Sequence, residues 1–269
     1  MRCKICGHDI GRDVFKLKVL NSFQAIYYQC DQCGYLFAEP VTWLEKAYSE
    51  SISKLDTGYM GRNIENVKLL NVFLKKVLRK NVKDKIVGVD FGGGYGVLTR
   101  MMRDLGYDWY WEDKYSNNLL AKGFEWDDKQ VVSNWGGGVE ILSAFEVFEH
   151  LDDPLSEITK MKEISCNIFF STLIYDTNFV LPSKDWWYFA PKTGQHISFY
   201  SEKTLKYIAK YFNLKYYRIT DERHFFTKEQ LDVKKLEFYM NGKVGKFLQK
   251  DMFWRDRKNG LQMRDMEQF

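Results

Sequence analysis

Four cysteines near the N-terminus are the residues whose types and spacing most directly suggest chemistry. They form two Cys-x-x-Cys pairs separated by a short segment: Cys3, Cys6, Cys30 and Cys33. Four thiolates can hold Zn²⁺ in a closed tetrahedral site, which is structural because no coordination position stays open. Each pair is followed by a glycine, Gly7 and Gly34, which supplies the left-handed backbone of such a knuckle. We therefore predict a structural zinc site.

Two disulfides or uncoordinated thiols are the alternatives for these cysteines. The first residues, MRCKICGHDI, contain no apolar core of a secretory signal, so we expect a cytoplasmic protein, and a reducing compartment favours metal over disulfide. Residues 1–40 would form a zinc ribbon of short strands. A unit of this size buries too little apolar surface to fold alone, and a structural zinc contributes roughly 10–16 kcal/mol. Cys166 lies in an apolar run and is expected in the core.

A glycine-rich turn follows the apolar run at 85–91. Its chemistry-bearing residues are Asp90, Gly92, Gly93, Gly94 and Gly96. An expected helix at 97–106 comes next, and a strand-to-helix turn of bare backbone lets a ligand approach the main chain and the helix N-terminus. A dinucleotide fingerprint would need glycine or alanine where Val97 or Thr99 stands, and no Gly-Lys-Ser/Thr of a phosphate loop follows.

A carboxylate is expected where the next strand ends, within 108–118. Asp113 lies about 20 residues past the glycines, where a ribose-binding acid belongs, and Glu112 is the reserve. One ionised carboxylate can accept both hydroxyls of a ribose diol. Residues 121–126 would lead into a third strand, which makes Phe124 and Glu125 weak candidates for contacts with an adenine ring.

The segment VEILSAFEVFEHLDDP, residues 139–154, is the second specific signal. It predicts a strand that breaks at residue 144 or 145 into a loop and a helix. Phe145, Glu146 and Val147 follow the break, and His150 stands just before the helix. Glu146 directly ends an apolar strand, which favours a place beside a ligand over a solvated surface. For His150 a capping or packing role is the alternative.

His196, in TGQHISFYS (193–201), is the candidate proton acceptor. A neutral imidazole can take a proton from a hydroxyl or an activated carbon acid near neutral pH. The aromatic run DWWYFAP (185–191) precedes it. The alternative is that His196 only holds a loop in place by a hydrogen bond.

Together these motifs resemble a known family. Asp-x-Gly-x-Gly-x-Gly at 90–96 is similar to motif I of the class I S-adenosylmethionine-dependent methyltransferases, and 139–154 is similar to their fourth motif. The resemblance implies that the glycines let the methionine moiety of the cofactor approach and that Asp90 orients the turn or reaches the cofactor's amino group. It also implies that residues 145–147 line the methionine end and that His150 opens the next helix.

The order of ribbon, glycine turn and His196 segment resembles the zinc-ribbon sugar C-methyltransferases of deoxysugar pathways. In that family a histidine within Glu-His-x-Ser-Tyr/Phe-Phe-Ser acts at the acceptor. This chain has Gln195 where the family has glutamate, so an oxygen acceptor is as plausible as a carbon acceptor. It also lacks the family's large C-terminal domain.

The implied fold class is α/β, a doubly wound seven-stranded sheet of the Rossmann-like class I methyltransferase type, preceded by a small zinc ribbon. In this family the last two strands, here 214–220 and 223–227, pair antiparallel. We expect a zinc ribbon at 1–40 and a linker with an amphipathic helix at 41–84. A methyltransferase core at 85–230 and a C-terminal helical extension at 231–269 would follow.

Composition limits the function classes. Lys plus Arg number 40 against 36 acidic residues, a formal charge of +4, which is weak support for nucleic-acid binding. No apolar stretch approaches the roughly 20 residues that span a bilayer. We expect methyl transfer from S-adenosylmethionine to a small polar acceptor, a sugar, nucleotide sugar or glycan on the resemblance alone. The alternatives are a zinc-ribbon RNA methyltransferase and a scaffold that binds the cofactor without turnover.

Overall fold

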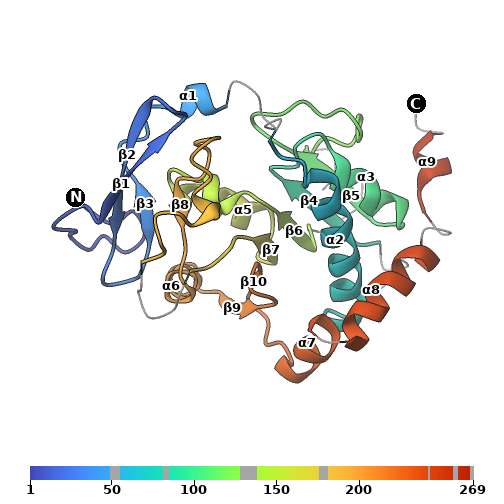
Figure 1. The fold of residues 1–269 in the computed structure, drawn as a ribbon. Helices are drawn as coiled ribbons and strands as arrows, with labels where there is room; N and C mark the ends of the chain where they lie inside the picture. The colour runs from blue at the N-terminus through green and yellow to red at the C-terminus, as the bar shows by residue number, and fades with distance from the viewer. Residues whose placement is uncertain are drawn as a thin grey trace.

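The computed structural model describes residues 1–48, 55–80, 85–127, 138–175, 181–241, 243–256 and 260–266. A six-stranded mixed sheet forms its centre, in the order β5-β4-β6-β7-β10-β9 (Figure 1). The strands are β4 (Val87–Phe91), β5 (Asp108–Glu112), β6 (Ile141–Ala144), β7 (Ile168–Ser171), β9 (Lys215–Arg218) and β10 (Arg223–Thr227). β5, β4, β6 and β7 are parallel, whereas β10 pairs antiparallel with both β7 and β9. The antiparallel pairing predicted for the last two strands is confirmed.

The central strands are buried on both faces. Every residue of β6 and β7 is buried, as are the first four of β4, and such strands carry near-continuous apolar runs because helices cover both faces of a parallel sheet. One apolar core lies under α2 (Tyr59–Val72), α3 (Val97–Asp104) and the C-terminal helices, and a second under α5 (Pro154–Ile164) and α6 (Glu202–Tyr211). The predicted α/β doubly wound class is confirmed.

The sheet has six strands among the described residues, one fewer than the seven predicted. The third strand is reduced to a single parallel bridge between Glu125 and Trp111, with Trp111 N–H donating to the Phe124 carbonyl at 2.7 Å. Gly123 just before it has a φ of 84°, a left-handed conformation that does not continue a strand. Residues 128–137, which follow, lie outside the described residues.

A second, antiparallel sheet forms at the N-terminus in the order β1-β2-β3-β8. It consists of β1 (Phe15–Val19), β2 (Phe23–Gln29), β3 (Leu36–Ala38) and β8 (Ser198–Phe199). β8 comes from the distant segment that carries His196 and pairs with β3 in the register Leu36↔Phe199; Figure 1 shows the two strands together. The N-terminal sheet, whose strands β2 and β3 flank Cys30 and Cys33, therefore includes a strand from the acceptor-side segment.

The remaining helices frame the main sheet. α1 (Leu44–Ala47) follows the first three strands, and α2 continues into a π-helical turn, η1 (Phe73–Val77). Beyond the sheet come α7 (Val233–Met240), α8 (Lys243–Asp256) and α9 (Gln262–Met266), of which α8 packs along α2 (Figure 1). Two short 3₁₀ turns, η3 (Phe148–His150) and η4 (Trp187–Phe189), lie near the strand ends. Within the described part of the chain, no helix combines the length and apolar character needed to cross a bilayer.

Candidate functional site

The glycine turn lies between β4 and α3, as predicted. Gly92 has a φ of 70°, and a Cβ built on it would stand 2.6 Å from Val147 Cγ2. A Cβ on Gly93 would stand 2.6 Å from Trp111 Cδ1. Side chains are excluded at both positions because neighbouring side chains already fill the space. The backbone of this turn is thus the surface offered to a ligand.

Asp90 lies under the turn and is 4% exposed. Its Oδ1 accepts a hydrogen bond from Ser143 Oγ at 2.8 Å. Burial raises the pKa of Asp90 to about 7, the Ser143 hydrogen bond opposes this shift, and the Asp113 carboxylate adds to it. A cationic group placed here would find a carboxylate that ionises readily in its presence.

Asp113 ties the end of β5 to the glycine turn. Its Oδ2 accepts from Gly94 N–H at 2.9 Å, and its Oδ1 accepts from the N–H groups of Tyr115 and Ser116 at 2.7 and 2.8 Å. A carboxylate offers about four acceptor positions, so three backbone donors leave little capacity for a ribose. Glu112 lines the same cavity, and burial followed by the charge of Asp113 raises its pKa.

The end of β6 carries an unusual backbone. Glu146 has a φ of 56°, and non-glycine residues in this region are uncommon and cluster at functional sites. Ser171 Oγ holds the turn, since it accepts from Glu146 N–H and donates to Glu146 Oε1, both at 2.7 Å. Glu146 Oε2 lies 3.3 Å from Arg62 Nε, and Arg62 also binds Asp56 at 2.7 Å.

His150 and His196, distant in sequence, lie in contact with ring centroids 4.9 Å apart. His150 ends η3, so it precedes rather than opens α5, whose cap is Asp153. Two hydrogen bonds hold the segment of His196 against η3. Ile197 N–H donates to the Glu149 carbonyl at 2.8 Å, and Ser198 Oγ donates to the Leu151 carbonyl at 2.5 Å.

Both imidazoles are held through Nδ1. His196 Nδ1 lies 2.6 Å from the Tyr188 carbonyl, and His150 Nδ1 lies 3.1 Å from the Gln195 carbonyl and 3.0 Å from Tyr48 Oη. Burial lowers the pKa of His150 to about 3, with His196 adding to the shift, and burial also lowers the pKa of His196. Both rings are therefore neutral near pH 7.

Gln195 has a structural role that a glutamate could not perform. Its Nε2 donates to the Ala47 carbonyl at the end of α1 at 2.9 Å, and an ionised carboxylate has no proton to donate.

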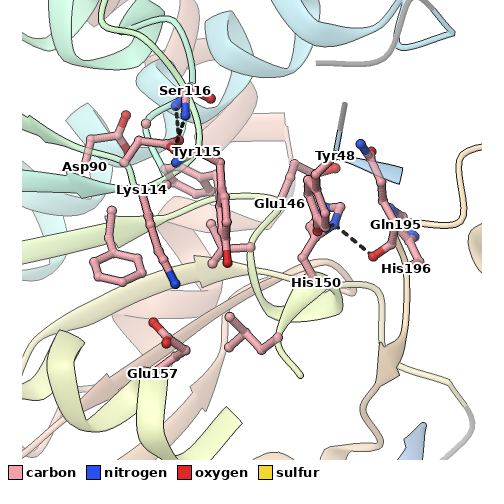
Figure 2. Close-up of a pocket in the computed structure, with 18 of the residues that line it drawn as sticks. Tyr48, Asp90, Lys114, Tyr115, Ser116, Glu146, His150, Glu157, Gln195 and His196 are labelled. Carbon is pink, nitrogen blue, oxygen red and sulfur yellow. Dashed lines mark hydrogen bonds between the residues drawn. The ribbon is translucent and has the colours of Figure 1, made fainter. Parts of the chain in front are cut away.

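A single cavity of 1180 Å³ joins these groups. Figure 2 shows Asp90 on one side of it and Glu146, His150 and His196 on the other. The residues predicted for the methionine end, the ribose and the acceptor line it, except Gly96: Asp90, Gly92, Gly93, Gly94, Asp113, Phe145, Glu146, Val147, His150 and His196. Gly96, with a φ of 83°, is the residue before α3.

The two adenine candidates do not line this cavity. Phe124 is 4% exposed and lies under the Arg103 guanidinium at 3.6 Å from its ring centroid. Glu125 accepts hydrogen bonds from Asn118 Nδ2 and Gly123 N–H. The neighbouring Trp126 does line the cavity.

The sequence did not point to Glu149, which is fully buried where η3 meets the segment of His196. The available signal was its position between Phe148 and His150 in the segment Phe-Glu-x-Phe-Glu-His-Leu. Tyr48 and Tyr188 were also missed, because their contacts with the histidines depend on the fold.

The four N-terminal cysteines converge in a separate cluster. Cys3 Sγ lies 3.6 Å from Cys33 Sγ and Cys6 Sγ lies 3.5 Å from Cys30 Sγ, with all four sulfurs within 4.8 Å of one another. A zinc–sulfur bond of about 2.3 Å in a tetrahedron separates sulfurs by about 3.8 Å, so the arrangement fits Zn²⁺. None of the four forms a disulfide, and Gly7 and Gly34 have the expected positive φ, 71° and 75°.

Comparison with known proteins assigns the chain to a family. Residues 63–219 match a family model described as "Methyltransferase domain". The chain belongs to this methyltransferase family. With its glycine turn, it is an S-adenosylmethionine-dependent methyltransferase of the α/β class. No curated protein matches the chain.

Several solved methyltransferases are similar to this chain. The plantazolicin methyltransferase BpumL in complex with SAH is 12% identical, covers 78% of this chain and 92% of its own, and has a TM-score of 0.44. An O-methyltransferase family protein from Burkholderia thailandensis is 12% identical, with 61% and 54% covered and a TM-score of 0.43. Magnesium protoporphyrin IX methyltransferase (ChlM) from Synechocystis PCC 6803 is 13% identical, with 68% and 90% covered and a TM-score of 0.40.

Proposed function

We propose that this methyltransferase transfers its methyl group to a small polar acceptor, a sugar or glycan, with a histidine as the proton acceptor. The observation that carries the proposal is the shared cavity, which has the glycine turn on one side and the His150–His196 pair on the other. In-line displacement at a sulfonium methyl needs an acceptor held opposite the leaving sulfur and a group that removes its proton.

The cofactor's methionine end is assigned to the glycine turn and to residues 145–147. Asp90 would face the cofactor's amino group, since a buried carboxylate gains most from a nearby cation. The ribose is assigned to Asp113 through the one acceptor position that its three backbone donors leave free, with Glu112, whose carboxylate lines the same cavity, as the second candidate.

His196 is the proposed proton acceptor. A carbonyl oxygen can only accept, so its contact with Tyr188 favours the tautomer with a proton on His196 Nδ1 and a free lone pair on Nε2. In the transfer, the bond between sulfur and the methyl carbon breaks, the acceptor oxygen bonds to that carbon, and the acceptor's proton passes to His196 Nε2. His150 is the second candidate.

The charges of the cavity favour an acceptor without phosphate groups. Among the described residues, ten aspartate and glutamate side chains line it, against three lysines and arginines, Arg62, Lys114 and Lys160. Arg62 is already bound by Asp56 and Glu146, and Lys160 by Glu157. Such a lining attracts a cationic cofactor and opposes polyanions, which favours an unphosphorylated sugar over a nucleotide sugar and argues against RNA.

The cysteine cluster is assigned a structural zinc. Its four sulfurs would complete a closed site that supplies folding free energy to the N-terminal strands and leaves no position for a reactant.

The test is methyl transfer from labelled S-adenosylmethionine to a panel of sugars, nucleotide sugars and RNA. We expect labelling of an unphosphorylated sugar or glycan, and His196→Ala to reduce turnover by on the order of 10²–10⁴-fold while S-adenosylhomocysteine affinity is kept. His8→Ala, at a largely exposed histidine, is the matched control. Full activity of His196→Ala would overturn the base assignment, and labelling of RNA with a steep salt dependence would overturn the acceptor class.

A further inference from the structure

Three potential metal ligands meet beside the acceptor side of the cavity. One carboxylate oxygen of Glu149 and one ring nitrogen each of His150 and His196 all lie within 4.8 Å of one another. Glu149 and His150 are neighbours in η3. His196 is held beside them by the hydrogen bonds that Ile197 and Ser198 donate to η3 and the residue after it. The cluster is therefore a product of the fold and is separate from the cysteine site.

Glu149 is the unusual member. Its exposed fraction is 0%, and neither carboxylate oxygen has a hydrogen-bond partner of normal geometry among the described residues. The nearby Tyr188 hydroxyl accepts from Leu173 N–H at 3.1 Å. Buried polar groups are nearly always paired, so the unpaired carboxyl of Glu149 is available as a ligand to a cation.

The two histidines present lone pairs rather than donors. Each Nδ1 faces a backbone carbonyl, that of Tyr188 for His196 and that of Gln195 for His150. Because carbonyls only accept, His196 Nδ1 carries the proton and its Nε2 has a free electron pair. The Gln195 carbonyl favours the same tautomer for His150, whose Nδ1 also lies 3.0 Å from Tyr48 Oη. Histidines that ligate metals characteristically donate their other ring N–H to a carbonyl or carboxylate in this way, which fixes the tautomer and the ring orientation.

We propose that Glu149, His150 and His196 form a binding site for a divalent transition-metal ion. Two imidazoles and one carboxylate make a three-ligand set that leaves coordination positions open. His150 and His196 line the cavity, whereas Glu149 lies behind them, so the open positions face the space assigned to the acceptor.

This inference rests on the proposed methyl transfer and changes only the role of His196. When the site is loaded, an acceptor hydroxyl can occupy an open position, and coordination lowers its pKa so that its proton passes to water. The resulting oxygen attacks the methyl carbon while the carbon–sulfur bond breaks, and His196 acts as a ligand. In the metal-free protein, His196 keeps its role as proton acceptor.

The test uses Co²⁺ as a spectroscopic probe on the full-length protein with its cysteine site filled by zinc. We expect one further equivalent of Co²⁺, with visible absorption that lacks the charge-transfer bands of cobalt bound to thiolate. Glu149→Gln and His196→Gln should each weaken this binding by at least about 100-fold, as removal of a direct ligand costs more than the 10–100-fold typical of outer-shell partners. Circular dichroism and thermal melts check that the variants fold.

His8→Gln is the control and should leave the second equivalent unchanged, because His8 lies beside the cysteine knuckles. The proposal is overturned if no equivalent binds beyond the cysteine site, or if the second equivalent survives in both Glu149→Gln and His196→Gln. The two proposals fail separately: absence of cobalt binding with methyl transfer intact rejects only the metal, whereas absence of S-adenosylhomocysteine binding rejects the proposed function.

Discussion

At the scale of residues, the site depends on where charge is buried. Asp90 is enclosed at the base of the cavity, and its pKa of about 7 means that the folded chain binds this proton more tightly than the unfolded chain, where an aspartate titrates near 3.9. The free energy of unfolding therefore falls as pH rises from about 4 to about 7, because the raised pKa favours the folded state only while the group is protonated. A cationic ligand offsets this loss of stability, because it favours the ionised form of Asp90.

Cofactor affinity should follow the ionisation of Asp90. If the bound amino group requires the carboxylate, affinity for S-adenosylhomocysteine rises about tenfold between pH 6 and pH 8, as expected for one group with a pKa near 7. Isothermal titration calorimetry across this range measures it. Asp90→Asn should bind more weakly at pH 8 and show a flat profile, and an equally flat profile in the unmodified protein would show that Asp90 does not ionise on binding.

The sequence identifies the glycines, Asp90, Asp113 and the two histidines, because turns and strand ends leave local signals. For Glu149 the only local signal is its place in the segment Phe-Glu-x-Phe-Glu-His-Leu, because its burial depends on a segment almost fifty positions away. Asp113 shows a different limit: its position was predictable, but its three backbone donors depend on how the loop after β5 folds back.

At the scale of elements, α6 connects the main sheet to the second cysteine pair. Ser201 caps this helix by accepting from Thr204 N–H at 3.1 Å, and Thr204 Oγ1 in turn donates to the Cys33 carbonyl at 2.9 Å. The helix N-terminus thus holds the second cysteine knuckle.

Removing the cap should destabilise the protein measurably. Ser201→Ala is expected to lower the free energy of unfolding by about 1 kcal/mol, because it leaves an N-terminal amide without its acceptor. Ser201→Thr keeps a hydroxyl and should recover most of this loss. Urea unfolding compares the three proteins, and equal midpoints for alanine and serine would show that the cap contributes nothing.

Strands and helices were predictable where an apolar run is long and a glycine or polar residue marks its end. β4, β6 and α3 fall where the sequence places them. Among the described residues, the third strand is only the bridge between Trp111 and Glu125, just after a glycine in a left-handed conformation. The pairing of β8 with β3 could not be foreseen, since the two residues of β8 carry no periodicity and their partner strand lies far away in the chain.

At the scale of the whole molecule, the N-terminal sheet connects the cysteine cluster with the acceptor side of the cavity. β8 begins two residues after His196 and completes the N-terminal sheet, whereas the glycine turn belongs to the main sheet. Loss of zinc should therefore affect the two sides of the cavity differently.

Cys30→Ser, which removes one zinc ligand without adding a chelator, should lower kcat by tenfold or more while affinity for S-adenosylhomocysteine stays within a factor of about three. Zinc content, turnover with the identified acceptor and calorimetric titration are the measurements. Cys166→Ser, at a cysteine outside the cluster, serves as the control. Unchanged turnover in the zinc-depleted variant would show that the N-terminal sheet does not position His196.

The central claim is that the cofactor lies against the backbone of the glycine turn, and titration of Gly92→Ala with S-adenosylhomocysteine tests it most directly. The added methyl group would meet Val147 at 2.6 Å on a backbone of positive φ, whereas Gly11→Ala adds the same group where nothing lies within 4 Å. The account predicts an affinity loss of at least about 100-fold for Gly92→Ala, equivalent to about 2.7 kcal/mol, and none for Gly11→Ala, with both variants folded by circular dichroism. Equal, undiminished affinity in the two variants would contradict it.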